Sequence, residues 1–189
     1  MDAETREYLT DAARAAVAGG YRTRAEIVDD LAEMVDDDEE LDATEADVTG
    51  VVDAVWQARL AEQASWPEVT DVDRLEAAFA ALDASGVVAR GNFTCCQTCG
   101  NSEIGGEVPA GASAEGYVYF HGQDTEHAVE GGALLLAYGS FAGGEEEAGA
   151  VGRRVAAELT ARELHVVWDG SVRRRIAVEL DWRRRLPTG

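Results

Sequence analysis

Hydrophobic residues recur at helical spacing near the start of the chain. Ile27, Leu31 and Met34 lie on one side of a predicted helix. The segment Thr23-Arg24-Ala25-Glu26 precedes them and has the pattern of a capping box, in which Thr23 and Glu26 satisfy the first free N–H groups. The pattern therefore predicts a helix that begins at Thr23.

Two more helices follow before residue 87. Thr44 begins one whose apolar side holds Val48, Val51, Val52, Val55 and Trp56. Thr70 or Asp71 begins the next, which carries the stripe Val72, Leu75, Phe79 and Leu82 and ends at Gly86. Between them, Pro67 closes the first helical section.

From residue 87 the pattern becomes α+β. Strands are predicted over residues 87–89, 117–121, 133–141 and 164–168, and a last strand alternates Ile176, Val178, Leu180 and Trp182 inward. Asp169-Gly170 predicts a hairpin turn, and residues 100–116 predict a loop. Asp124 is expected to cap a short helix, and another helix follows Gly143-Gly144. We predict an acidic helical region over residues 1–66 and an α+β domain over residues 67–189, with a small mixed sheet packed on one side by helices.

Charge narrows the classes of partner. The net charge is −21, all 16 basic residues are arginine, and residues 1–86 hold 23 acids against 6 arginines. A body this acidic repels phosphate backbones. We therefore expect no nucleic-acid partner, and we do not expect the three helices to form a DNA-reading helix-turn-helix.

Three further features of the sequence indicate in which cellular compartment the protein resides. No apolar run approaches the ~20 residues that cross a bilayer, and the acidic start Met1-Asp2-Ala3-Glu4 lacks the pattern of a signal peptide. Three cysteines, an odd number, do not form a secreted disulfide framework. We expect a soluble cytoplasmic protein with no membrane partner.

The three cysteines Cys95, Cys96 and Cys99 fall within five residues. Thr94 and Gln97 have capping-box spacing, so we expect Thr94 to be the N-cap of a helix. Cys95 and Cys96 would then lie in the first turn, where the partial positive charge of a helix start stabilises a thiolate.

Cys96 and Cys99 form a C-x-x-C pair, a spacing used by zinc sites. Cys96, Cys99 and His121 are the predicted metal ligands, and His127 or Cys95 would be the fourth. A second C-x-x-C, which would complete a zinc knuckle, is absent from the sequence.

The same residues also suit thiol chemistry. A C-x-x-C at a helix start supplies an attacking thiolate and a resolving thiol. A thiol hydrolase would instead pair Cys96 or Cys95 with His121 and with Asp124 or Glu126. Cysteine also packs as a small hydrophobe, so a purely structural cluster is the remaining alternative.

Two segments carry a family resemblance. Asn-Phe-Thr-Cys-Cys-Gln-Thr-Cys-Gly at residues 92–100 and Tyr-Phe-His-Gly-Gln-Asp-Thr-Glu at residues 119–126 resemble an uncharacterised family of small proteins from high-GC bacteria, known as a domain of unknown function. The resemblance covers roughly residues 65–185 and implies no activity.

The sequence thus leads to two hypotheses. The first is a binding or regulatory module with a Cys/His site that holds zinc. The second is a thiol-dependent enzyme, either a C-x-x-C redox protein or a Cys-His hydrolase, with Cys96, Cys95, His121 and Asp124 as candidate catalytic residues.

Overall fold

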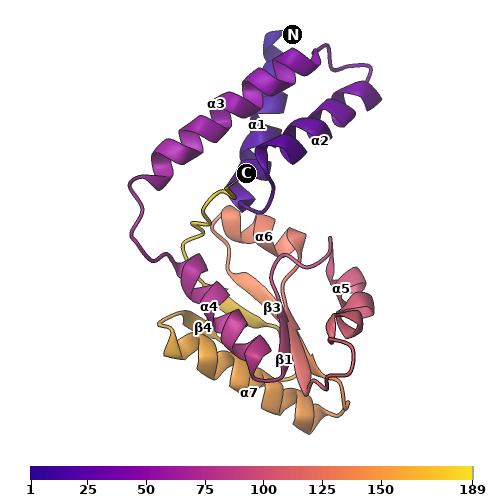
Figure 1. The fold of residues 1–189 in the computed structure, drawn as a ribbon, viewed down its shortest axis with the longest axis vertical. Helices are drawn as coiled ribbons and strands as arrows, with labels where there is room; N and C mark the ends of the chain where they lie inside the picture. Colours follow the sequence, from indigo (N-terminus) through magenta and orange to yellow (C-terminus); the bar gives the residue numbers. More distant parts are fainter. Residues whose placement is uncertain (189) are drawn as a thin grey trace. The chain divides into compact units, whose positions relative to one another are not determined.

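The structure is a computed structural model that describes residues 1–188. It divides into two compact units (Figure 1). One comprises residues 1–68 together with the segment from Arg183 onward, and the other comprises residues 69–182. The predicted α+β class is confirmed, since helices accompany one mixed sheet. Over the described residues, no helix has the length and apolarity needed to span a membrane.

The first unit contains three helices, α1 (Ala3–Gly19), α2 (Arg24–Asp37) and α3 (Glu45–Gln63). The capping box at Thr23 is confirmed, and Thr44 forms another with Asp47 at the start of α3. The apolar faces of the three helices meet in one core that includes Leu9, Ala13, Val17, Ile27, Leu31, Val48, Val52 and Trp56. The spacing of the apolar residues thus determines which face each helix buries.

The C-terminal segment belongs to this helical unit. Leu186 is buried in its core, and the Leu186 N–H donates to Gln63 Oε1 at 2.6 Å. The Arg184 guanidinium lies 4.0 Å from the centre of the Tyr21 ring and donates to the Gly20 carbonyl at 3.0 Å. The chain therefore returns to its first helices after Trp182.

The second unit is built on a five-stranded sheet in the order β1-β2-β3-β5-β4. Its strands are β1 (Val87–Arg90), β2 (Gly116–Tyr119), β3 (Leu134–Ser140), β4 (His165–Val167) and β5 (Ile176–Glu179). β1 and β2 are parallel, and the other neighbouring pairs are antiparallel. Each predicted strand is present with slightly different ends.

Two helices cover one face of the sheet. They are α4 (Asp71–Ala84), capped by Thr70, and α7 (Glu145–Ala161), and Figure 1 shows both on the same side. Phe79 of α4 meets Phe120 with ring centroids 5.7 Å apart. On α7, Gly152 allows close packing, because a Cβ there would lie 2.6 Å from Tyr138 and 2.9 Å from Trp168.

The opposite face is covered as well, which the sequence did not predict. Residues 97–107 form a short helix α5 (Gln97–Glu103) and a 3₁₀ turn η1 (Ile104–Glu107) in place of the first part of the expected loop. Ile104 is only 2% exposed and packs with Val88, Tyr119 and Ala137. The expectation of helices on one side was wrong, because a single apolar residue among glycines and polar residues anchors this cover.

The remaining helix, α6 (Gly122–Val129), connects β2 to β3. Its N-cap is His121 and not Asp124, which is the third helical residue. The predicted cap was therefore wrong by three positions. His121 and Asp124 form a capping box in which the imidazole takes the role usually played by a hydroxyl or carboxylate.

The fit between α7 and the sheet can be tested with two glycines of the same helix. We expect Gly152→Ala to destabilise the protein by about 1–3 kcal/mol, because the added methyl overpacks the Tyr138–Trp168 contact. Gly149→Ala is the matched control, since its Cβ would meet the flexible end of Arg153 at 3.3 Å, which can move aside, and Val172 at an ordinary 3.6 Å. We expect that control to be neutral or to gain up to about 1 kcal/mol of helix propensity. Chemical denaturation measures both, and equal stability of the two variants would contradict the proposed packing.

Candidate functional site

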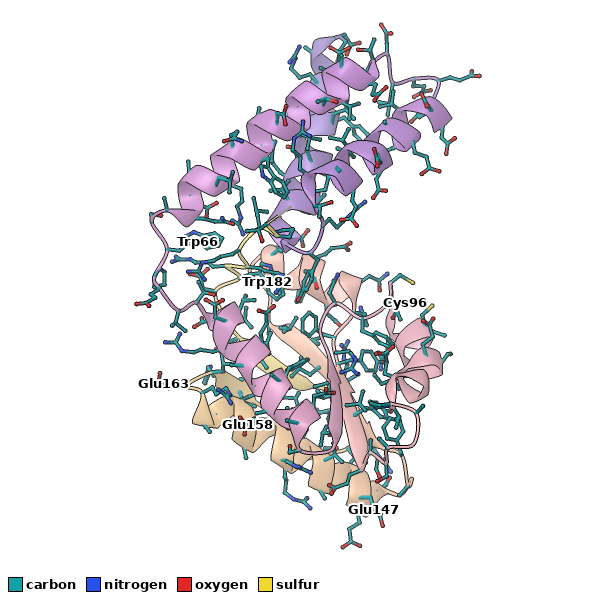
Figure 2. All side chains as sticks on the ribbon, viewed as in Figure 1. Trp66, Cys96, Glu147, Glu158, Glu163 and Trp182 are labelled. Carbon is teal, nitrogen blue, oxygen red and sulfur yellow. The ribbon has the colours of Figure 1, made fainter. Side chains whose placement is uncertain are left out.

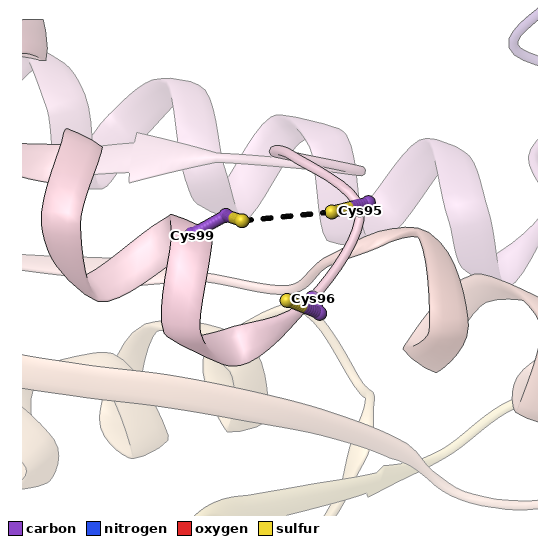
Figure 3. A group of neighbouring side chains, drawn as sticks. All are labelled: Cys95, Cys96 and Cys99. Carbon is purple, nitrogen blue, oxygen red and sulfur yellow. Dashed lines mark hydrogen bonds between the residues drawn. The ribbon is translucent and has the colours of Figure 1, made fainter.

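The three cysteines converge on one point. Their Sγ atoms all lie within 4.8 Å of one another, and the Cys95 and Cys99 sulfurs are 3.6 Å apart (Figure 3). All three are free thiols. Cys95 is exposed, while Cys96 and Cys99 are partly buried, and Figure 2 shows Cys96 at the edge of the molecule beside α5. The group is therefore accessible from solvent.

The local structure differs from the predicted capping box. Helix α5 begins at Gln97, with Cys96 as its N-cap residue in an extended conformation. Thr94 has a φ of +60°, and its hydroxyl donates to the Cys96 carbonyl at 3.2 Å. Cys95 and Cys96 thus precede the helix, and only Cys99 lies in its first turn.

Tertiary contacts hold the loop before the cysteines in an unusual shape. Asn92 and Thr94 both have left-handed backbone, at φ values of +51° and +60°. Such a conformation costs of order 1–3 kcal/mol for a residue other than glycine, and a β-branched threonine is a particularly rare case. The start of α6 holds both residues: Gly122 N–H donates to the Thr94 carbonyl at 3.0 Å, and the Thr125 hydroxyl donates to Asn92 Oδ1 at 2.8 Å.

On the other side, Tyr119 fixes α5. Its hydroxyl lies 2.6 Å from Asn101 Oδ1 and 3.1 Å from the Gln97 carbonyl. Gly100 packs directly on the ring, where a Cβ would overlap the aromatic carbons. Burial raises the pKa of Tyr119 to about 12, so the phenol stays protonated and keeps its donor. The positions of the cysteines are therefore set by contacts on both sides.

The thiols differ in acidity. The backbone N–H of Cys99, followed by the neighbouring thiols, lowers the pKa of Cys96, although the sulfur makes no side-chain cap hydrogen bond of regular geometry. Hydrogen bonding to Cys95 and Cys96 raises the pKa of Cys99 to about 11. Of these two thiols, Cys96 therefore loses its proton first as the pH rises, and Cys99 loses its proton later.

His121 faces Asp124 and not the cysteines. Its Nδ1 accepts the Asp124 N–H at 3.3 Å, and its Nε2 lies 3.1 Å from Asp124 Oδ2. Burial, with Arg175 nearby, lowers the pKa of His121 despite the opposing charge of Asp124. Within the described residues, no hydrogen bond joins His121 to a cysteine, and the group of side chains able to meet at one ion contains neither His121 nor His127.

Arg175 is the partner that sequence reasoning missed. Its side chain is only 22% exposed and donates to both carboxylate oxygens of Asp124. It also donates to the Leu135 carbonyl. Alternation along a strand gave no signal for this pair, because Arg175 directly precedes β5 and its partner is 51 residues away.

The structure therefore gathers part of the predicted ligand set. Cys96 and Cys99 lie together as their spacing indicated, and the sulfur of Cys95, expected at most as a substitute fourth ligand, lies 3.6 Å from that of Cys99. An extended Cys96 followed at once by a helical turn brings residues 95 and 99 back together.

Comparisons with known proteins agree with the resemblance in the sequence. No curated protein and no solved structure matches the chain. A family model described as "Domain of unknown function (DUF6891)" matches residues 2–186, which extends the similarity from the sheet-containing part through the acidic helices. The chain therefore belongs to this family of domains of unknown function.

Proposed function

We propose that the protein is a metal-binding module whose ligands are the thiolates of Cys95, Cys96 and Cys99. The observation that carries the proposal is the convergence of the three sulfurs within 4.8 Å. Zinc binds thiolate sulfur at about 2.3 Å, so two sulfurs on one tetrahedral ion are about 3.8 Å apart. The Cys95–Cys99 distance of 3.6 Å is close to that spacing before any ion is bound.

The surroundings favour a binding site over three cysteines that only pack. Cysteines that serve as small hydrophobes belong in an apolar interior, whereas Cys95 is exposed and its two neighbours are partly so. The loop that carries them retains two left-handed residues at an energetic cost, and strain of this kind collects at functional sites. Zinc is the ion predicted from the sequence.

Metal binding requires all three thiols to lose their protons, although the pKa values of Cys96 and Cys99 differ. A thiolate is the ligand form, so each bound cysteine must release its proton. Cys96 is already the more acidic, while the raised pKa of Cys99 means that the ion has to displace a tightly held proton. Affinity is therefore expected to rise with pH over the neutral range.

A thiol-dependent redox enzyme is the second candidate. It is favoured by the contrast between an acidic Cys96 and a protonated Cys99, which resembles the division between attacking and resolving thiols. The hydrolase version has less support, because both ring nitrogens of His121 face Asp124.

Metal content of protein purified without chelator tests the first proposal. We expect close to one equivalent of bound ion, and loss of a ligand in Cys95→Ser, Cys96→Ser or Cys99→Ser should weaken zinc binding by more than the about 10- to 100-fold typical for an outer-shell partner. Thr98→Ala, an exposed change in the same turn, is the control and should bind as the wild type does. Zinc affinity that is unchanged in all three serine variants would contradict the proposal.

Alkylation of metal-free protein tests the second candidate. Iodoacetamide reacts with thiolates, so we expect Cys96 to be modified at lower pH than an ordinary cysteine with a pKa of about 8.5. Cys99 should stay largely unmodified until the pH approaches its pKa of about 11. Peptide mapping by mass spectrometry separates the sites. If the three cysteines react in parallel as the pH rises, the redox assignment loses its physical basis.

A further inference from the structure

The number of ligands at the cysteine group indicates which metal ion the group can coordinate completely. We infer that Cys95, Cys96 and Cys99 form a three-sulfur site that is complete for monovalent copper and leaves zinc with one open position. This inference rests on the proposed metal-binding function and concerns which ion that site satisfies. It differs from the zinc site predicted from the sequence, in which a histidine contributes.

The first argument is the absence of a fourth ligand from the part of the chain that the structure describes. Structural zinc sites are closed by four protein ligands, usually cysteine and histidine. His121 would be the natural fourth, but it is the N-cap of α6, is 5% exposed, and has both ring nitrogens directed at Asp124. Turning it toward the cysteines would break a buried capping box.

Asp124 cannot take that place either. Its side chain is 6% exposed and both of its oxygens accept from Arg175. Removing one partner of a buried ion pair typically costs about 3–5 kcal/mol. His121 and Asp124 are thus held in a separate network, and among the described residues no other histidine, aspartate or glutamate joins the three cysteines in a group that could share one ion.

The second argument is the chemistry of the three sulfurs. Thiolates are soft ligands that select monovalent copper as well as zinc. For an ion about 2.3 Å from each sulfur, three coplanar sulfurs are about 4.0 Å apart, which lies between the 3.6 Å Cys95–Cys99 distance and the 4.8 Å limit of the group. The spacing of about 3.8 Å for a tetrahedral ion lies in the same interval, so the distances admit both ions and the number of ligands separates them. Three thiolates complete a trigonal site for monovalent copper, whereas zinc would take a fourth ligand from solvent.

Exposure agrees with this assignment. Cys95 is solvent-accessible, so the open side of a zinc ion would face water. Three thiolates leave a charge of −2 with monovalent copper and −1 with zinc. Because the chain is acidic, the more negative copper site is repelled more strongly than the zinc site. Exposure to water and salt weakens this repulsion.

X-ray absorption on the full-length protein, loaded with each ion separately, tests the inference. Copper is added anaerobically with ascorbate to keep it monovalent. We expect one copper ion with three sulfur neighbours and no nitrogen, and one zinc ion with three sulfurs and one oxygen. Cys96→Ser should reduce the copper site to two sulfurs, and His121→Asn should leave both spectra unchanged.

Two results would overturn the inference while leaving the metal-binding proposal intact: a zinc site with a histidine nitrogen, or a copper site with only two sulfurs in the wild type. Failure to bind either ion would remove the proposed function itself. Because His121 is buried, circular dichroism must first show that His121→Asn folds; if it does not, the wild-type zinc spectrum alone decides whether a nitrogen is bound.

Discussion

The close approach of α5 to Tyr119 determines the arrangement of the second face of the sheet. Gly100 lies on the Tyr119 ring without room for a Cβ, and the phenol reaches the polar atoms of Gln97 and Asn101. This single contact fixes the helix that carries Cys99, and Ile104 of the adjoining turn completes the apolar layer beneath. A larger residue at position 100 would lift α5 from the sheet and displace the candidate site with it.

Two sets of contacts consequently hold the cysteine group in place. Tyr119 fixes the segment after Cys96, and the start of α6 fixes the segment before Cys95 through Asn92 and Thr94. A hydrogen bond contributes about 0.5–1.5 kcal/mol net, which is comparable with the strain of each left-handed residue. The strained loop therefore persists because the neighbouring elements hold it, and the fold itself keeps the three sulfurs together.

The polar network of His121, Asp124 and Arg175 has a supporting role. It is buried, satisfies the first turn of α6 and ties that turn to the strand that follows Arg175. Burial, with Arg175 nearby, lowers the pKa of His121 against the opposing charge of Asp124. Through Gly122 and Thr125, the same turn positions the loop that leads to the cysteines.

Much of the architecture followed from local signals in the sequence. The capping box at Thr23, the apolar helical spacing after Thr44 and Thr70, and the apolar runs and alternation of the strand segments are short-range patterns, and they predicted most helices and the strands. The C-x-x-C spacing indicated that Cys96 and Cys99 lie near one another. These features depend on residues only a few positions apart, where backbone geometry alone decides the outcome.

Tertiary structure decided the rest. Thr94 has the sequence pattern of an N-cap but is held left-handed by Gly122, and residues 100–107, predicted as part of a loop, instead fold into helical turns because Ile104 and Gly100 pack on the sheet. His121 was expected at the cysteines, yet the structure pairs it with Asp124, whose charge is in turn bound by Arg175 from 51 residues away. Local sequence determined that the three cysteines lie close together along the chain. Only long-range packing decided how the segments on either side of the cysteines are held and that the histidine faces elsewhere, because burial of a charge and close contact with a ring depend on partners far along the chain.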